Sequence, residues 1–134
     1  MSLHAEGTFD VNNAPLPADS ATDNTAIGRF ALDKQFHGDL EGVSNGEMLG
    51  AGNPATGTAG YVAIEQVTGI LNGLTGSFAL QHFGAMEENK FELTVKVVPG
   101  SGTGDLIGIS GRMTITPVNG KHSWKFDYIL PSQK

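Results

Sequence analysis

The feature that most constrains the fold of this chain is a glycine-rich segment that occurs three times. Residues 69–78 and 104–113 align without a gap on the pattern Gly-x-Leu-x-Gly, aliphatic, Ser/Thr, Gly, x, Met/Phe. A third copy, residues 38–48, fits with one residue inserted near Asn45. Glycine adopts positive φ at no steric cost, so each copy predicts a strand end, a tight turn and a bent strand start. Three such corners favour a closed or nearly closed barrel, with a solenoid as the alternative.

Between these corners, runs rich in β-branched and aromatic residues alternate with glycine turns, a pattern typical of short strands. The expected strands are residues 7–11, 26–36, 43–51, 60–71, 74–84, 91–98, 107–117 and 121–130. Residues 14–24 contain two prolines and several Asp, Ser and Asn residues, and are expected to form a loop. The sequence therefore predicts a single all-β domain over residues 1–134, an eight-stranded antiparallel up-and-down β-barrel.

Two-residue turns allow the strand register to be derived. Asn72-Gly73 is a strong hairpin dipeptide, and a tight turn there pairs Leu71 with Leu74. The pairs that follow, all on one face with Tyr61, are Ala63 with His82, Glu65 with Leu80, and Val67 with Phe78. A turn at residues 88–89 adds four alternating residues to that face: Phe91, Leu93, Val95 and Val97. A turn at Asn119-Gly120 gives the pairs Ile115 with Trp124 and Met113 with Phe126.

The reverse face of the first hairpin is also largely apolar. Its residues are Val62, Ile64, Gln66, Ala79, Gln81 and Phe83. Exposed apolar faces of this kind are often covered by another molecule, so we expect a homo-oligomer, with a dimer favoured.

The register places Glu65 and His82 on the mostly apolar face, diagonal to each other across two strands. Diagonal neighbours lie about 7–8 Å apart at the backbone, so long side chains can meet. An enclosed carboxylate and imidazole perturb each other's pKa and can act as an acid/base pair on a bound ligand. The alternative is a satisfied polar pair that fixes the register. The candidate ligand-contacting residues around the pair are Tyr61, Phe78, Gln81, Trp124, Phe126 and Tyr128.

Three other motifs that suggest a catalytic, phosphate-binding or metal site are better explained as structural features. Residues 42–46 match Gly-x-Ser-x-Gly, but that nucleophile motif requires a strand-to-helix turn, and no helix is predicted there. Residues 99–104 lack the spacing of a phosphate loop and are expected to be a flexible loop. The histidines at positions 4, 37, 82 and 122 have no metal-ligand spacing, so we expect no metal and no cofactor.

Composition limits the partners. The absence of cysteine excludes disulfides, thiolate metal sites and a cysteine nucleophile. A net charge of −6 with eight scattered basic residues argues against nucleic acid. No apolar run approaches the length of about 20 residues that spans a bilayer, so no membrane partner is expected. The N-terminus shows no secretory pattern, and we expect a cytoplasmic protein.

Three blocks, residues 60–69, 76–82 and 97–106, together with the closing Phe126-Asp127-Tyr128, resemble a bacterial family of domains of unknown function. That family is similar in fold to the allene oxide cyclase-like barrels, which are eight-stranded and lipocalin-like in shape. The resemblance implies the same barrel here and gives weight to positions matching Glu65, Gln81 and His82. It does not imply the cyclase reaction, because no catalytic residues of the cyclases map onto this chain. Residues 12–15 also depart from the family pattern, which has an aromatic residue there.

Two functions are compatible with these observations. The first is a barrel that binds a small, largely apolar ligand in its interior, either as a binding protein or as a cofactor-free isomerase or cyclase using Glu65 and His82. The second is a non-catalytic structural or interaction barrel whose interior is packed by side chains such as Trp124 and Phe126. A cavity of a few hundred Å³ reached by Glu65 and His82 would favour the first.

Overall fold

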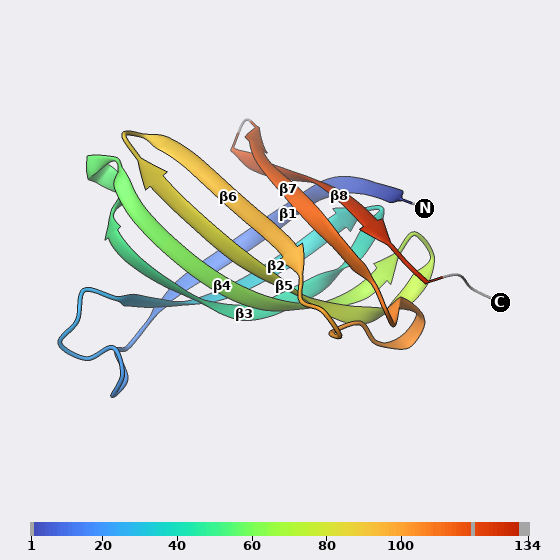
Figure 1. The fold of residues 1–134 in the computed structure, drawn as a ribbon, viewed down its shortest axis with the longest axis horizontal. Helices are drawn as coiled ribbons and strands as arrows, with labels where there is room; N and C mark the ends of the chain where they lie inside the picture. The colour runs from blue at the N-terminus through green and yellow to red at the C-terminus, as the bar shows by residue number, and fades with distance from the viewer. Residues whose placement is uncertain (1, 119, 132–134) are drawn as a thin grey trace.

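The computed structural model describes residues 2–118 and 120–131, and within them eight antiparallel strands close into a barrel in which neighbours in sequence are neighbours in space (Figure 1). The strands are β1 (Leu3–Leu16), β2 (Gly28–Gly38), β3 (Leu40–Asn53), β4 (Thr58–Leu71), β5 (Leu74–Glu87), β6 (Lys90–Val97), β7 (Ser110–Val118) and β8 (Lys121–Ile129). Two short 3₁₀ helices, η1 (Pro54–Thr56) and η2 (Gly104–Leu106), lie in the connections. The predicted up-and-down β-barrel is confirmed.

The predicted registers are also confirmed. Asn72 and Gly73 both have positive φ, as do Glu88 and Asn89, which is the geometry of the turns that match the twist of a hairpin. The turn at 72–73 pairs Leu71 with Leu74 and brings Glu65 opposite Leu80. The expected pairs between β7 and β8 are present as well, although Asn119, in the predicted turn, lies outside the described residues.

Most strand boundaries differ from the prediction, and two of these differences, at β1 and β7, concern where a strand begins or ends relative to a loop. Residues 14–16, expected in a loop, continue β1 and pair with residues 29–31 of β2. The ladder between β1 and β8 ends at Phe9 and His122, so this part of β1 has a neighbour on one side only. Pro15, which has no N–H to donate, is tolerated on such an edge. At the other boundary, residues 107–109 precede β7 instead of beginning it.

The glycine repeat builds one end of the barrel. Its three leucines, Leu40, Leu71 and Leu106, are almost completely buried in the same core cluster. Asp39 and Asp105 occupy the same motif position, and each carboxylate accepts a backbone N–H from another segment, Glu6 and Thr75 respectively. The copy at residues 104–113 departs from the expected hairpin corner, because its first three residues form η2.

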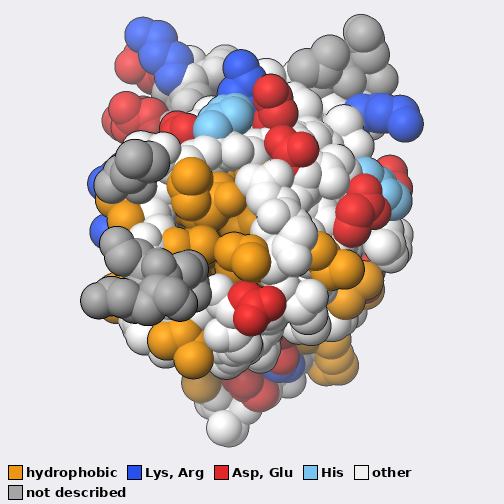
Figure 2. Space-filling model, turned by 90° about the vertical axis from the view of Figure 1, so that its right-hand side faces the viewer, with side chains coloured by type: hydrophobic (Ala, Val, Ile, Leu, Met, Phe, Trp, Pro, Cys, Tyr) orange, Lys and Arg blue, Asp and Glu red, His pale blue; other side chains and the backbone are white. Residues whose placement is uncertain are grey.

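The two ends of the barrel are filled differently. The half that contains the three repeat leucines, which we call the closed half, holds a continuous core of buried side chains. Among its largest members are Phe36, Phe78, Trp124, Phe126 and Tyr128. Figure 2 looks onto this end, where hydrophobic side chains gather near the middle with acidic and histidine side chains around them. The opposite half, bounded by η1 and the turn at residues 88–89, is the open half.

The strand ladders are of unequal length. β4 and β5 pair from Ala59–Met86 to Leu71–Leu74. In contrast, among the residues that the structure describes, β6 and β7 share only the pairs Val95–Met113 and Lys96–Arg112.

Within the described residues, no helix has the length and apolar character needed to cross a bilayer.

Candidate functional site

A buried polar cluster lies between the two halves, centred on Glu65. The Glu65 side chain is fully buried, and both of its oxygens accept hydrogen bonds. Oε1 accepts one from Ser44 Oγ at 2.5 Å. Oε2 accepts one from Lys34 Nζ at 2.8 Å and one from His82 Nε2 at 2.5 Å. Three side chains, separated by up to 48 positions in sequence, therefore share the Glu65 carboxylate.

Strand alternation explains why these side chains meet. Lys34, Ser44, Glu65 and His82 come from four consecutive strands, β2 to β5, which are neighbours in the barrel. On each strand the side chains of alternate residues point inward. Along β2, for example, Lys34 occupies an inward position between Leu32 and Phe36, both of which are buried. The cluster is thus set by register, without a loop to position it.

The partners of Glu65 keep it ionised. Burial alone would raise the pKa of the carboxyl group, because a charge is costly in an apolar interior. The hydrogen bond from His82 and the charges of Lys34 and His82 outweigh that effect and lower the pKa to about 2. The interior therefore holds a carboxylate and an ammonium group in direct contact, and Lys34 also lies over the ring of Phe9, 4.5 Å from its centroid.

The ionised carboxylate determines how His82 is oriented. Because Glu65 can only accept, Nε2 of His82 must carry the proton that it donates to Oε2. In the neutral imidazole, Nδ1 then has a free lone pair, and it lies 3.3 Å from the Tyr61 hydroxyl. Burial and the charge of Glu65 raise the pKa of Tyr61 to about 12, so the phenol is neutral and can donate to Nδ1. The arrangement is a chain of hydrogen bonds from Tyr61 through His82 to Glu65.

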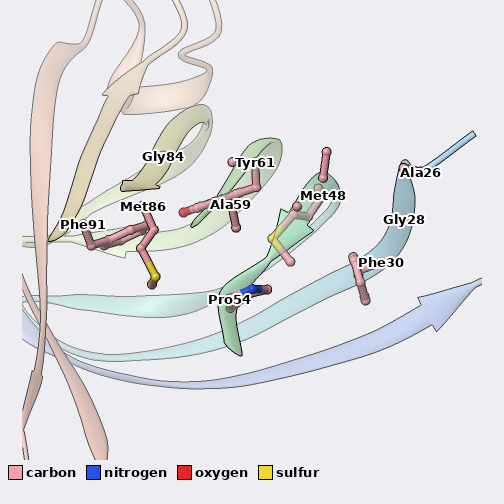
Figure 3. Close-up of a pocket in the computed structure, with 14 residues that line it drawn as sticks. Ala26, Gly28, Phe30, Met48, Pro54, Ala59, Tyr61, Gly84, Met86 and Phe91 are labelled. Carbon is pink, nitrogen blue, oxygen red and sulfur yellow. The ribbon is translucent and has the colours of Figure 1, made fainter. Parts of the chain in front are cut away.

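This chain ends at a hollow in the open half. A cavity of about 460 Å³ is lined mostly by apolar residues, among them Phe30, Met48, Met86 and Phe91, one from each of four strands, with Tyr61 on a fifth (Figure 3). A second cavity of about 270 Å³ shares Met48, Tyr61 and Phe91 with it and is also lined by Lys34 and His82. The two cavities are adjacent, and together they lead from the barrel mouth to the polar cluster.

The structure brings together only part of the predicted site. Tyr61, Glu65 and His82 form one connected group. Gln81 lies on the outer face and is exposed, because it alternates with the inward His82. The remaining candidates pack in the closed half and do not line the two cavities at the open end: Phe78, Trp124, Phe126 and Tyr128.

Phe78, Phe126 and Tyr128 form a stacked series, with ring centroids 5.7 Å apart for the first pair and 5.0 Å for the second. Trp124 donates its indole N–H to the Thr8 carbonyl. These four aromatic side chains therefore serve the core of the closed half, as the alternating pattern of β8 also indicates.

Sequence reasoning missed Lys34 and Ser44. The signal was present for Lys34, since it interrupts the alternation Phe30, Leu32, Phe36 at an inward position. A charged residue at such a position needs a partner of opposite charge. Among the described residues, no three His, Asp or Glu side chains converge as metal ligands would.

Fold and site together define a closed eight-stranded barrel, open and apolar at one end, with an ion pair and a histidine at the inner wall of its cavity. The chain belongs to the family described as "Protein of unknown function (DUF3224)", whose model matches residues 5–128. It is similar to a protein of unknown function from that family in Shewanella oneidensis MR-1, which has a crystal structure and shares 46% sequence identity with this chain. The match covers 99% of this chain and 100% of that one, with a TM-score of 0.90.

Among curated proteins no match is found. The family assignment confirms the resemblance to a family of domains of unknown function. The likeness in fold to the allene oxide cyclase-like barrels stays a prediction.

Proposed function

We propose that this protein binds a small, largely apolar ligand in the open half of the barrel and acts on it as a cofactor-free isomerase or cyclase. The observation that carries the proposal is the apolar cavity of about 460 Å³, which adjoins a cavity lined by His82. Ligand sites in proteins are typically apolar pockets of about 300–1,000 Å³ with a few placed polar groups. Here the polar groups are Tyr61, His82 and Lys34.

The proton-transfer step is assigned to His82. Its Nε2–H is fixed on Glu65, so Nδ1 is the position where a proton can be gained or lost once the Tyr61 hydroxyl turns away from it towards the ligand. The carboxylate holds the imidazole ring in one orientation through the Nε2–H hydrogen bond, with Nδ1 directed away from Glu65. Glu65 is thereby a positioning residue, and His82 is the catalytic base and acid of the proposed reaction.

A thermal-shift screen of small apolar metabolites tests the binding. A ligand present at about 100 times its Kd stabilises the folded protein by about 2.7 kcal/mol, which is readily seen as a rise in Tm. Gly50 faces the cavity, and a Cβ there would have only ordinary contacts at 3.6 Å or more, so Gly50→Leu should fill the mouth without disturbing the fold. The matched control is Ala85→Leu on the exposed outer face of β5.

The ligand-induced shift should be lost in Gly50→Leu and kept in Ala85→Leu. A hit that stabilises both variants equally binds elsewhere and contradicts the proposal, as does a screen in which no compound stabilises the protein. With a substrate in hand, His82→Ala should lower turnover about 10²–10⁴-fold while the barrel stays folded.

The second candidate function is a structural or interaction barrel. The packed core of the closed half favours it, and so does the outer face of β4 and β5, where Val62, Ile64 and Phe83 are 47%, 59% and 66% exposed. Unfolding of His82→Ala would support this alternative, because the pair would then act as a structural tie. Association of two copies through the outer face stays a prediction, which light scattering in solution would check.

A further inference from the structure

We propose that the substrate of this site is a carbonyl compound, whose oxygen Lys34 holds while His82 removes a proton from the carbon beside the carbonyl group. The inference rests on the function proposed above. It adds to that function a substrate class and a second catalytic residue, neither of which the family description supplies.

Glu65 is not available to a ligand. Its two oxygens accept three hydrogen bonds, from Ser44, Lys34 and His82, and the side chain has no exposed surface. The groups of the cluster that line the inner cavity are instead Lys34, His82 and Tyr61. Within the cluster, the polar contacts with a ligand must therefore come from these three side chains, while Asn13 and His122 also line the cavity.

Lys34 has donors to spare. An ammonium group carries three N–H bonds, and the one hydrogen bond that Nζ makes among the described residues goes to Glu65. The rest of its surroundings include the ring of Phe9, and the side chain is 5% exposed. A buried cation with free donors beside an apolar cavity is suited to an oxygen atom on which negative charge develops, because such an interaction is strong where water is excluded.

The charge balance selects a carbonyl group over a carboxylate. Lys34 is already neutralised by Glu65, so a ligand that arrives as an anion would add an uncompensated charge to the interior. A ketone or aldehyde arrives neutral. Negative charge appears on its oxygen only as His82 gains a proton, and the net charge of the site does not change during the step. The other charged or titratable side chains that line the inner cavity are Tyr61, which is neutral, and His122.

The step balances without a co-reactant. The Nδ1 lone pair of His82 forms a bond to the proton of the α-carbon, the C–H pair becomes a C=C bond, and the carbonyl π pair moves to oxygen, where Lys34 donates to it. In a β,γ-unsaturated ketone, Nδ1 then returns the proton to the γ-carbon, which gives the conjugated isomer. No bond to the protein forms, and nothing is oxidised or reduced.

A cyclic β,γ-unsaturated ketone is the probe, because its conversion to the conjugated isomer is followed by ultraviolet absorbance. The cycloalkene of the same ring size serves as the binding control without an oxygen. The test variant is the double substitution Lys34→Met with Glu65→Gln, which removes both charges and leaves no unpaired ion inside. Lys96→Met on the exposed side of β6 is the matched control.

We expect the native protein and Lys96→Met to isomerise the ketone, and the double variant to do so about 10²–10³-fold more slowly. The affinity for the ketone relative to the cycloalkene should fall about tenfold in the double variant. Glu65 cannot donate to a ketone and its two oxygens are already hydrogen-bonded, so this loss of preference reports on the missing ammonium group of Lys34.

An unchanged ketone preference in the double variant, or an unchanged isomerisation rate, overturns this proposal. If the native protein nevertheless binds the cycloalkene, the proposed function of ligand binding still holds. If the native protein binds neither compound, the proposed function fails, and this inference fails with it.

Discussion

The closed and open halves of this barrel are built by the same sheet but differ in what fills the inward positions. On β4 and β5 the closed half places Val67, Leu71 and Phe78 inward, and all three are fully buried. In the open half the same two strands place Tyr61, Gly84 and Met86 inward, around a cavity. The ladder is continuous through both regions, so hydrogen bonding does not distinguish them. The volume of the inward side chains decides whether a stretch of the barrel is a packed core or encloses a cavity.

This contrast divides the work within one small domain. The closed half supplies the hydrophobic stabilisation, since its side chains are removed from water almost completely. The open half contributes less to stability and leaves room for a ligand. The cluster around Glu65 lies at the border, where the packed core holds one side of it rigid and the cavity reaches the other side.

The largest expected effect compares one substitution in both halves. Phe126→Ala removes a fully buried ring that stacks on Phe78 and Tyr128, and should lower the free energy of unfolding by about 3–5 kcal/mol. Phe91→Ala removes a ring that is 52% exposed at the mouth, and should cost about 1 kcal/mol or less. Urea unfolding monitored by Trp124 fluorescence measures both. Equal losses in the free energy of unfolding for the two variants would refute the division into a packed half and a half that encloses a cavity.

Breaking the ion pair at the border should cost nearly as much as the core substitution. Lys34→Met leaves the Glu65 carboxylate buried without its cation, and should lower the free energy of unfolding by about 3–5 kcal/mol. Adding Glu65→Gln should recover a large part of that loss, because no unpaired charge then remains. A double variant as unstable as Lys34→Met would show that packing, and not charge, dominates the border.

Acid should weaken the border selectively. Folding lowers the pKa of Glu65 from 4.5 to about 2, so the stabilisation is complete above pH 5 and is lost as the pH falls towards 2. At about 1.4 kcal/mol per pKa unit, the loss is on the order of 3 kcal/mol. The free energy of unfolding of the native protein should therefore approach that of Glu65→Gln between pH 5 and pH 2. A difference that stays constant over this range would contradict the assignment of Glu65 as an ionised, paired group.

The smallest effects come from adding a single methyl group. In the closed half, a Cβ on Gly76 would lie 2.2 Å from the Thr103 carbonyl oxygen, so Gly76→Ala should cost about 1–3 kcal/mol. In the open half, Gly50→Ala meets only ordinary contacts and should change stability by less than about 0.5 kcal/mol. Thermal denaturation of the pair checks whether the difference in free space extends to the backbone.

The sequence predicted the fold and part of the site because both follow from strand register. One dipeptide, Asn72-Gly73, determines which residues of β4 and β5 face inward, and thus brings Glu65 and His82 together. Lys34 and Ser44 could not be placed with the same certainty, because the registers of β2 on β3 and of β3 on β4 depend on connections without an Asn-Gly turn. The glycine repeat at residues 104–113 misled for a different reason: local hydrogen bonds from Leu106 N–H to the Thr103 carbonyl and from Ile109 N–H to the Leu106 carbonyl form a 3₁₀ turn in place of a hairpin corner.

The emptiness of the open half was beyond sequence reasoning altogether. Both halves show the same alternation of apolar residues, and neither pattern states how much volume the inward side chains leave unfilled. Phe91 illustrates this, since its predicted inward position was compatible with either a packed or an open interior, and in the structure it stacks on Tyr61 at the cavity wall.

The short ladder between β6 and β7 has a mechanical consequence. A ring of strands is only as resistant to stretching as its weakest junction, and here that junction consists of two residue pairs. The β6–β7 junction is therefore the place where the barrel wall is expected to open first. A change in the circumference of the barrel should widen the gap between β6 and β7 while the other ladders keep their spacing. Backbone amides of β6 and β7 that point across this junction should therefore exchange with solvent sooner than those of β4.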